Sequence, residues 1–185
     1  MYGLVNQMVQ DYVTTHHGAA VWAKVAVAAN LDRVPFLLSA PYPDALTYTL
    51  VGATCAETGL PAHEVLVGIG HFFTGFAGSR GYDDLMRAAG GSFPTFLTNL
   101  DRLHSQLGNI FPELRPPSFR VSDATEDALR LHYYSTREGL APMVIGLMHS
   151  LGDRFNLHIA VQHVVARGDD RDHDEFAIQF APRQA

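Results

Sequence analysis

The hydrophobic periodicity of the chain changes at the proline pair Pro116-Pro117. Before this pair, apolar residues recur every three to four positions in several segments, as on the buried face of amphipathic helices. After it, apolar and polar residues alternate in short segments, as in strands with one buried face, and one longer helical segment lies among them. This order predicts an α+β fold, in which an N-terminal helical half is followed by a small antiparallel sheet with a long helix. The expected helices cover residues 1–17, 19–29, 45–58, 62–76, 82–88, 93–110 and 140–155, and the expected strands lie at 119–121, 129–133, 157–161 and 176–180.

Composition and charge narrow the class of protein. The length of 185 residues suits one domain, so we expect a single domain over residues 1–185. The apolar run from Ala19 to Ala29 contains Lys24 and is too short to cross a bilayer. A net charge of −6 disfavours general nucleic-acid binding. Because Cys55 is the sole cysteine and no signal peptide is recognisable, we expect a cytoplasmic protein without a disulfide framework.

A histidine lies on the apolar face of the helix expected at 93–110. The apolar stripe of this helix consists of Phe96, Leu97, Leu100, Leu103, Leu107 and Ile110. His104 follows Leu100 by one turn and should point inward with the leucines, whereas Asp101 should point away. A neutral imidazole in apolar surroundings must hydrogen-bond, titrate or bind a metal. The helix alone leaves two interpretations open, a core histidine bonded to a carbonyl or an axial ligand of a buried metal cofactor.

The helix expected at 62–76 mixes glycines with large apolar side chains. Glycine in a helix is less favourable than alanine by about 1 kcal/mol, so Gly68, Gly70 and Gly75 need a packing reason. Close approach of another backbone or of a flat ligand would be such a reason, and an ordinary helix crossing would be another.

Three hydrogen-bond donors alternate along the end of the strand expected near 129–133. If this strand is regular, Tyr133, Ser135 and Arg137 share a face with Leu129 and Leu131 and continue a buried side of the sheet. A phenol, a hydroxyl and a guanidinium in a row suit a ligand with paired carboxylates. The alternative is an exposed polar face of a strand.

A second possible metal site lies near the C-terminus. His163, His173 and the aspartates around them could form a hydrolytic metal centre, which would make the protein a metal-dependent hydrolase. No two histidines in this segment have the close spacing of zinc-binding sequence motifs, which weakens this interpretation.

Taken together, these residues resemble the haem-nitric oxide/oxygen binding (H-NOX) domain, which is the regulatory N-terminal domain of the soluble guanylate cyclase β subunit and has bacterial relatives. The resemblance covers essentially the whole chain. It rests on the opening MYGLVN, the helix FLTNLDRLHSQL, the segment RPPSF, the YxSxR motif in the form YYSTR, and the segment EGLAPMVIGL. A YxSxR motif with a histidine about thirty residues upstream is a specific combination.

The resemblance implies a role for each matching residue. His104 would be the proximal ligand of the iron of haem b, which would lie buried between the two parts of the fold. Tyr133, Ser135 and Arg137 would bind the haem propionates. Pro117 would press on the porphyrin and distort it from planarity. Leu100, one turn before His104, would also contact the cofactor.

The resemblance also suggests which gas binds. Oxygen-binding members of the family carry a tyrosine in the helix after YxSxR, whereas this chain has Met143 and Leu147 in that helix, with Phe73 and Val5 expected to face them. We therefore expect a sensor that is not an enzyme, binds nitric oxide and carbon monoxide at ferrous haem, and excludes oxygen. Nitric oxide would weaken or break the bond between iron and His104 and so signal to a separate protein, such as a histidine kinase or a cyclic-dinucleotide enzyme. The alternatives are a haem oxygen or redox sensor, the metal-dependent hydrolase, and a haem-free interaction module.

Overall fold

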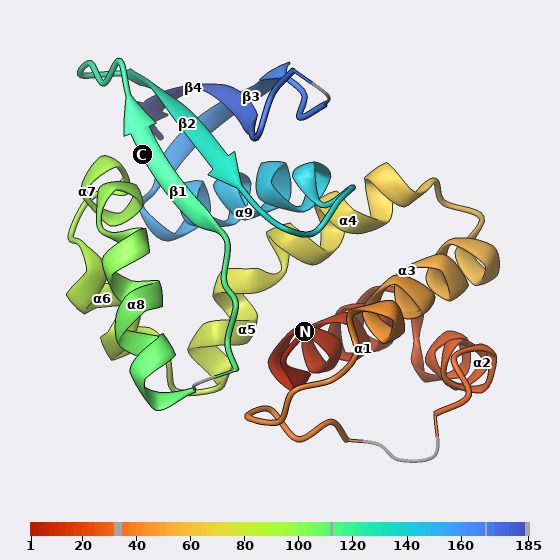
Figure 1. Ribbon diagram of the computed structural model, residues 1–185. Coiled ribbons are helices and arrows are strands. Elements are labelled where there is room, and N and C mark those ends of the chain that lie inside the picture. The colour runs from red at the N-terminus through yellow and green to blue at the C-terminus, as the bar shows by residue number, and fades with distance from the viewer. Residues whose placement is uncertain (32–34, 112, 169, 184–185) are drawn as a thin grey trace.

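The computed structural model describes residues 1–31, 35–111, 113–168 and 170–183, and for Ile110 it describes the backbone alone. The chain has the expected α+β order, with helices first and a sheet containing one long helix afterwards (Figure 1). The helices are α1 (Gly3–His17), α2 (Ala19–Ala28), α3 (Asp44–Thr58), α4 (Ala62–His71), α5 (Phe73–Ser79), α6 (Asp83–Ala89), α7 (Phe93–Thr98), α8 (Leu100–Ile110) and α9 (Ala141–Arg154). Among the described helices, none is both long enough and apolar enough to cross a membrane.

The described part of the chain forms one four-stranded antiparallel sheet with the strand order β1-β2-β4-β3. The strands are β1 (Ser118–Ser122), β2 (Ala128–Tyr134), β3 (Leu157–Val165) and β4 (Asp174–Pro182). Leu131 of β2 pairs with Val121 on one side and with Phe176 on the other. The inward rows of β2 and β4 pack against α9, and they consist of Leu129, Leu131, Tyr133, Phe176, Ile178 and Phe180.

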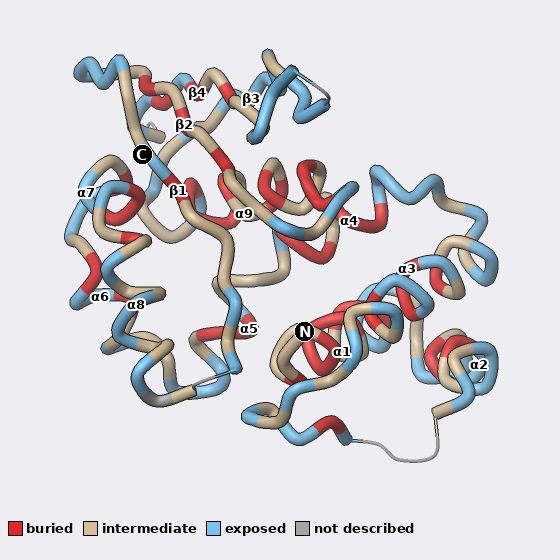
Figure 2. The backbone as a smooth tube through the Cα atoms, viewed as in Figure 1, coloured by how far each residue is buried: buried red, intermediate tan, exposed pale blue. Residues whose placement is uncertain are grey.

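Buried apolar residues gather in two separate cores (Figure 2). One core lies under the sheet and contains Phe93, Leu97 and Met148 among its buried residues. The other lies among the first helices and contains Val13 and Leu50. The helices α4 and α5 run between these two regions (Figure 1).

The glycines of α4 permit a close crossing with α9. A Cβ atom on Gly70 would lie 2.1 Å from the carbonyl oxygen of Met143, and a Cβ atom on Gly146 would lie 2.0 Å from the carbonyl oxygen of Val67. Because real Cβ atoms do not come this close to backbone oxygens, only glycine fits at these two positions. The packing reason for Gly70 is therefore the close approach of the α9 backbone at this helix crossing.

Two of the expected helices are each divided into two. The segment 62–76 changes direction at Phe72, because the N–H group of Thr74 donates to Ser150 Oγ of α9 at 3.0 Å instead of continuing the helix. The segment 93–110 is divided at Asn99, whose side-chain amide donates to the carbonyl oxygen of Ala89 at 2.8 Å. Both breaks coincide with contacts to residues of another helix, which the periodicity of a single helix does not reveal.

Candidate functional site

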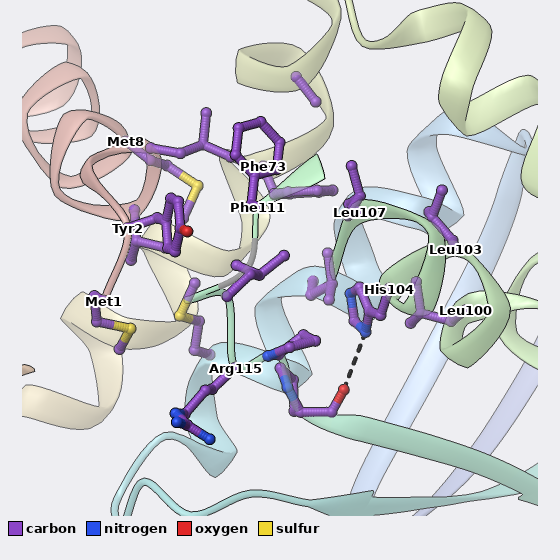
Figure 3. A pocket seen from close by; sticks show the side chains of 18 of the residues that line it. Met1, Tyr2, Met8, Phe73, Leu100, Leu103, His104, Leu107, Phe111 and Arg115 are labelled. Carbon is purple, nitrogen blue, oxygen red and sulfur yellow. Dashed lines mark hydrogen bonds between the residues drawn. The ribbon is translucent and has the colours of Figure 1, made fainter. Parts of the chain in front are cut away.

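A cavity of about 630 Å³ is lined by residues of both cores. All of the predicted site residues line it, and these are Val5, Phe73, Leu100, His104, Pro117, Tyr133, Ser135, Arg137, Met143 and Leu147. Figure 3 shows His104 and Leu107 on one side, with Tyr2, Met8 and Phe73 on the other. The structure therefore brings together the inward histidine and the row of donors, which the sequence had indicated separately.

The imidazole of His104 has one nitrogen fixed and one nitrogen free. Its Nδ1 lies 3.0 Å from the carbonyl oxygen of Pro117, and because a carbonyl can only accept, Nδ1 carries the proton and donates (Figure 3). Nε2 then keeps its lone pair, and it has no hydrogen-bond partner among the described residues. Burial lowers the pKa of His104, although the hydrogen bond to Pro117 opposes this change. A neutral imidazole oriented by a carbonyl is the arrangement found for metal-ligating histidines.

Asp101 fastens α8 to the start of β1, close to the Pro117 carbonyl. Its Oδ1 accepts from the backbone N–H group of Phe119 at 2.6 Å, and its Oδ2 accepts from Ser118 Oγ at 2.5 Å. Asp101 does not line the cavity, and these two donors hold its carboxylate against the strand. Since Asp101 lies one turn before His104, the two side chains hold the same helix against the same short segment.

The donors Tyr133, Ser135 and Arg137 line the cavity, but they do not form one strand row. The strand β2 ends at Tyr134, so the expectation that the strand continues to Arg137 was wrong. The chain turns after Tyr134, and Ser135 Oγ accepts from the N–H group of Arg137 at 3.0 Å. Tyr133 is 5% exposed, and its burial raises the pKa of the phenol, which therefore stays protonated and able to donate.

Arg137 already holds a carboxylate at the edge of the cavity. Its Nε donates to Asp44 Oδ2 at 2.9 Å, and its Nη1 donates to the carbonyl oxygen of Arg115 at 2.7 Å. Asp44 also pairs with the N-terminal ammonium group of Met1. Burial alone would raise the pKa of Asp44, but the hydrogen bonds from the N-terminus and from Arg137 outweigh it and lower the pKa. This link joins α3, the N-terminus and the segment after β2, and no sequence pattern indicated it.

The side of the cavity formed by α1, α5 and α9 is apolar. Its lining residues are Leu4, Val5, Met8, Phe73, Leu140, Met143, Val144 and Leu147. Thr74 does not line the cavity, because its hydroxyl lies 2.7 Å from Ser150 Oγ and is bonded there. Further hydroxyl groups of the lining come from segments outside these helices, and they belong to Tyr2, Ser39, Tyr42 and Tyr82.

The residues around the cavity fit haem. The free nitrogen of His104 can bind iron, and the apolar walls suit the faces of a porphyrin. The propionates require cationic and hydroxyl donors, and Arg137, Tyr133 and Ser135 supply them. The sequence did not identify the lining contributed by Met1 and Tyr2 and by residues 38–44, because these segments reach the cavity only through tertiary contacts.

The other proposed metal site is not assembled in the expected way. His163 Nε2 is bonded to Asp174 Oδ1 at 2.8 Å, and the ring of His163 stacks on Phe176. His173 instead lies against His132, at 3.0 Å between His173 Nε2 and His132 Nδ1. The hypothesis of a hydrolase built on His163 and His173 is therefore not supported by their positions.

Comparison with known proteins agrees with the geometry. A profile of the family described as haem-NO-binding matches residues 2–163. Soluble guanylate cyclase gcy-31 of Caenorhabditis elegans is 29% identical over 163 residues, which cover 88% of this chain and 23% of the cyclase. The chain thus spans about a quarter of the length of that relative.

Solved structures share the fold over nearly the full length. An H-NOX protein from S. oneidensis in the Fe(II) ligation state has a TM-score of 0.88 at 20% identity, with 100% of this chain and 98% of that chain covered. An oxygen-binding H-NOX domain related to soluble guanylate cyclases has a TM-score of 0.82 at 20% identity, with 99% and 96% covered. Because the family profile covers most of the chain and the cavity has the groups that haem requires, the chain belongs to the haem-NO-binding (H-NOX) family of haem-based sensors of diatomic gases.

Proposed function

We propose that residues 1–185 form one H-NOX domain that binds nitric oxide and carbon monoxide at ferrous haem and excludes oxygen. Haem supplies an iron centre that takes a diatomic gas as a ligand. In this proposal His104 Nε2 is the protein ligand of the iron, and Tyr133, Ser135 and Arg137 hold the propionates. Pro117 and Leu100 contact the porphyrin from the side that carries His104.

The apolar lining contributed by α1, α5 and α9 is the observation that carries the gas selectivity. Bound oxygen is polar and needs a hydrogen-bond donor, whereas nitric oxide and carbon monoxide depend on one much less. Val5, Phe73, Met143 and Leu147 offer no donor, and the hydroxyl of Thr74 is engaged with Ser150. This wall therefore favours the gases that bind without a donor.

The signal would pass through α8. If nitric oxide weakened or broke a bond between iron and His104 Nε2, His104 would lose its anchor on the metal. The helix is then held by the hydrogen bond from His104 to Pro117 and by Asp101, and both anchors end on the segment 117–119. A shift of α8 would move its exposed residues Arg102, Ser105 and Gln106, which a separate partner could read. Such a partner would be a histidine kinase or a cyclic-dinucleotide enzyme, and it must bind the two states of α8 with different affinity.

Absorption spectra of the reduced, haem-loaded protein test this proposal. We expect the spectrum to change on addition of nitric oxide or carbon monoxide and to show no stable oxygen complex in air. A stable oxygen complex would instead favour an oxygen sensor, for which the hydroxyl of Tyr2 in the lining is the structural argument. The variant Tyr2→Phe would then separate a role of that hydroxyl from a general property of the cavity.

A further inference from the structure

Three potential metal ligands converge on the outer face of the sheet, away from the haem cavity. His132 lies on β2, Glu175 lies on β4, and their Cα atoms are direct partners across the antiparallel pair. His173 immediately precedes β4 and joins them. Among the described residues these three form a group whose ligand atoms all lie within 4.8 Å of one another.

The spacing of the ligand atoms matches a small divalent ion. His132 Nδ1 and His173 Nε2 are 3.0 Å apart, and Glu175 Oε1 lies 3.4 Å from His173 Nε2 and 3.9 Å from His132 Nδ1. Ligands about 2.0 to 2.2 Å from a tetrahedral zinc ion lie roughly 3.3 to 3.5 Å from one another. The observed separations bracket this range, so an ion fits between the three atoms with small side-chain adjustments.

The outward nitrogens of both histidines are already bonded. His132 Nε2 lies 2.8 Å from Ser122 Oγ, and His173 Nδ1 donates to Asp172 Oδ1 at 2.6 Å. These bonds fix each ring so that the remaining nitrogen points to the common centre, as the outer partners of metal-bound histidines do. The ring of Tyr134 stacks on His173 at 4.3 Å between centroids and limits its rotation.

The carboxylate of Glu175 is divided between two partners. Its Oε2 lies 3.3 Å from the Nη1 atom of Arg130, while its Oε1 faces the two histidines. The side chains of His173 and Glu175 are each 13% exposed and that of His132 is 19% exposed, so the group is largely shielded but open on one side. Such a group can supply three ligands and leave a fourth position to water.

We infer that His132, His173 and Glu175 form a binding site for a divalent transition metal, with zinc as the principal candidate. Two imidazoles and one carboxylate suit Zn²⁺ and its neighbours in the first transition series, whereas Ca²⁺ and Mg²⁺ prefer oxygen ligands alone. The site is distinct from the haem site, because His132 and Tyr133 are consecutive in β2 and point to opposite faces of the sheet. A bound ion would link β2 to the start of β4 directly behind Tyr133.

The test uses the haem-loaded protein after dialysis against a chelator that removes zinc and leaves haem iron in place. Zinc is then titrated against a chromophoric chelator, and the bound metal is measured by elemental analysis. We expect one zinc per chain in addition to the haem iron. The variants His132→Ala and His173→Ala should each lose at least tenfold in zinc affinity, and Asp172→Ala should lose about ten- to a hundredfold because an outer partner is removed.

The matched control is His158→Ala, because His158 is an exposed histidine of β3 outside the group. This variant should bind zinc like the wild type, and all variants should keep the wild-type haem spectrum and circular dichroism. An excess of Mg²⁺ should not displace the zinc. The inference is overturned if wild-type protein binds zinc no more tightly than His132→Ala, or if His158→Ala weakens binding equally. It is likewise overturned if X-ray absorption of the zinc-loaded protein shows no imidazole ligands, and in each case the three side chains form a hydrogen-bonded cluster alone.

Discussion

The wall of the cavity that carries His104 is joined to the sheet by polar bonds beside the site, whereas the wall facing it presents apolar side chains to the cavity. On the His104 side, the imidazole and the carboxylate of Asp101 both bind the segment from Pro117 to Phe119. On the other side, α4 and α9 meet through glycine, and Phe73, Met143 and Leu147 present no polar group. A bond between iron and His104 Nε2 could form or break while these hydrogen bonds stay in place, whereas a close-packed apolar wall is hard to deform. The first wall is therefore suited to changing state, and the second to selecting a small ligand.

The largest effect should come from removing His104, the proposed ligand of the iron. The variant His104→Gly should lose most of its haem, because His104 is the one histidine among the described lining residues, and added imidazole should restore binding. The ratio of Soret absorbance to protein absorbance measures the haem content. The control His158→Ala should keep wild-type haem content. Normal haem content in His104→Gly without imidazole would exclude His104 as the ligand.

Arg137→Ala should weaken haem binding next most strongly. A hydrogen bond to a charged group contributes about 1.5 to 3 kcal/mol, so the affinity should fall roughly ten- to a hundredfold when measured by haem transfer to an acceptor protein. Asp44→Asn is the matched variant, because it removes the carboxylate that Arg137 holds and keeps the guanidinium. We expect Asp44→Asn to retain haem at least as well as the wild type. Equal affinity in Arg137→Ala and wild type would contradict the propionate role.

A donor placed on the apolar wall should remove its selectivity. In Leu147→Tyr we expect an oxygen complex to form in air, stabilised by the new hydroxyl, with an affinity roughly tenfold above that of the wild type. Leu147→Phe adds a ring of similar size without the hydroxyl and should behave like the wild type. The oxygen spectrum of each ferrous variant provides the measurement. If both variants bind oxygen equally, cavity shape rather than hydrogen bonding controls the selectivity.

The bonds of Asp101 should have a moderate effect on stability. Asp101→Ala leaves the donors of Ser118 and Phe119 without their acceptor, and we expect the free energy of unfolding in urea to fall by about 1 to 3 kcal/mol. Asp84→Ala removes an exposed carboxylate paired with Arg87 and should change stability by less than about 1 kcal/mol. A loss in Asp101→Ala no larger than in Asp84→Ala would show that α8 is held mainly by apolar contacts.

The smallest predicted effect is a change in how the stability of the protein depends on pH. Because its partners lower the pKa of Asp44 in the folded protein, Asp44 contributes stability above its ordinary pKa of 3.8 and loses this contribution as the pH falls below that value. Thermal unfolding at pH 6 and at pH 3 should therefore show a smaller loss of stability for Asp44→Asn than for the wild type. An identical loss in both proteins would mean that the carboxylate of Asp44 is not stabilised by the fold.

The sequence predicted features that depend on local spacing along the chain, and it missed features that depend on contacts between separate segments. Helical spacing was enough to place His104 on an inward face, and strand alternation was enough to place Tyr133 on the buried face of β2. Strand alternation failed for Arg137, because β2 ends before this residue and a turn brings Arg137 to the cavity. The spacing did not reveal the partners of Asp101, because they belong to a strand that follows two prolines.

Contacts between distant segments could not be derived from spacing. His132 and Glu175 are direct partners only once β2 and β4 pair in one particular register, and a shift by one residue would place them on opposite faces of the sheet. The break at Phe72 likewise depends on Ser150, which belongs to a helix far along the chain. The roles expected for the residues of the YxSxR motif came from the resemblance to a known family. Periodicity alone would have left the function of these residues open.

The close crossing of α4 and α9, at Gly70 against the carbonyl of Met143 and at Gly146 against the carbonyl of Val67, fixes the spacing of these helices beside the cavity. Phe73 follows Gly70 by three residues and Met143 precedes Gly146 by three, so both lie within one turn of a point where main chain touches main chain. Side chains can rotate to fill or open space. The two main chains at this crossing are already in contact, and a larger residue at either glycine would have to displace a carbonyl oxygen of the other helix. The room available to a diatomic molecule is therefore adjusted by the size of individual side chains, and the spacing of the two helices remains constant.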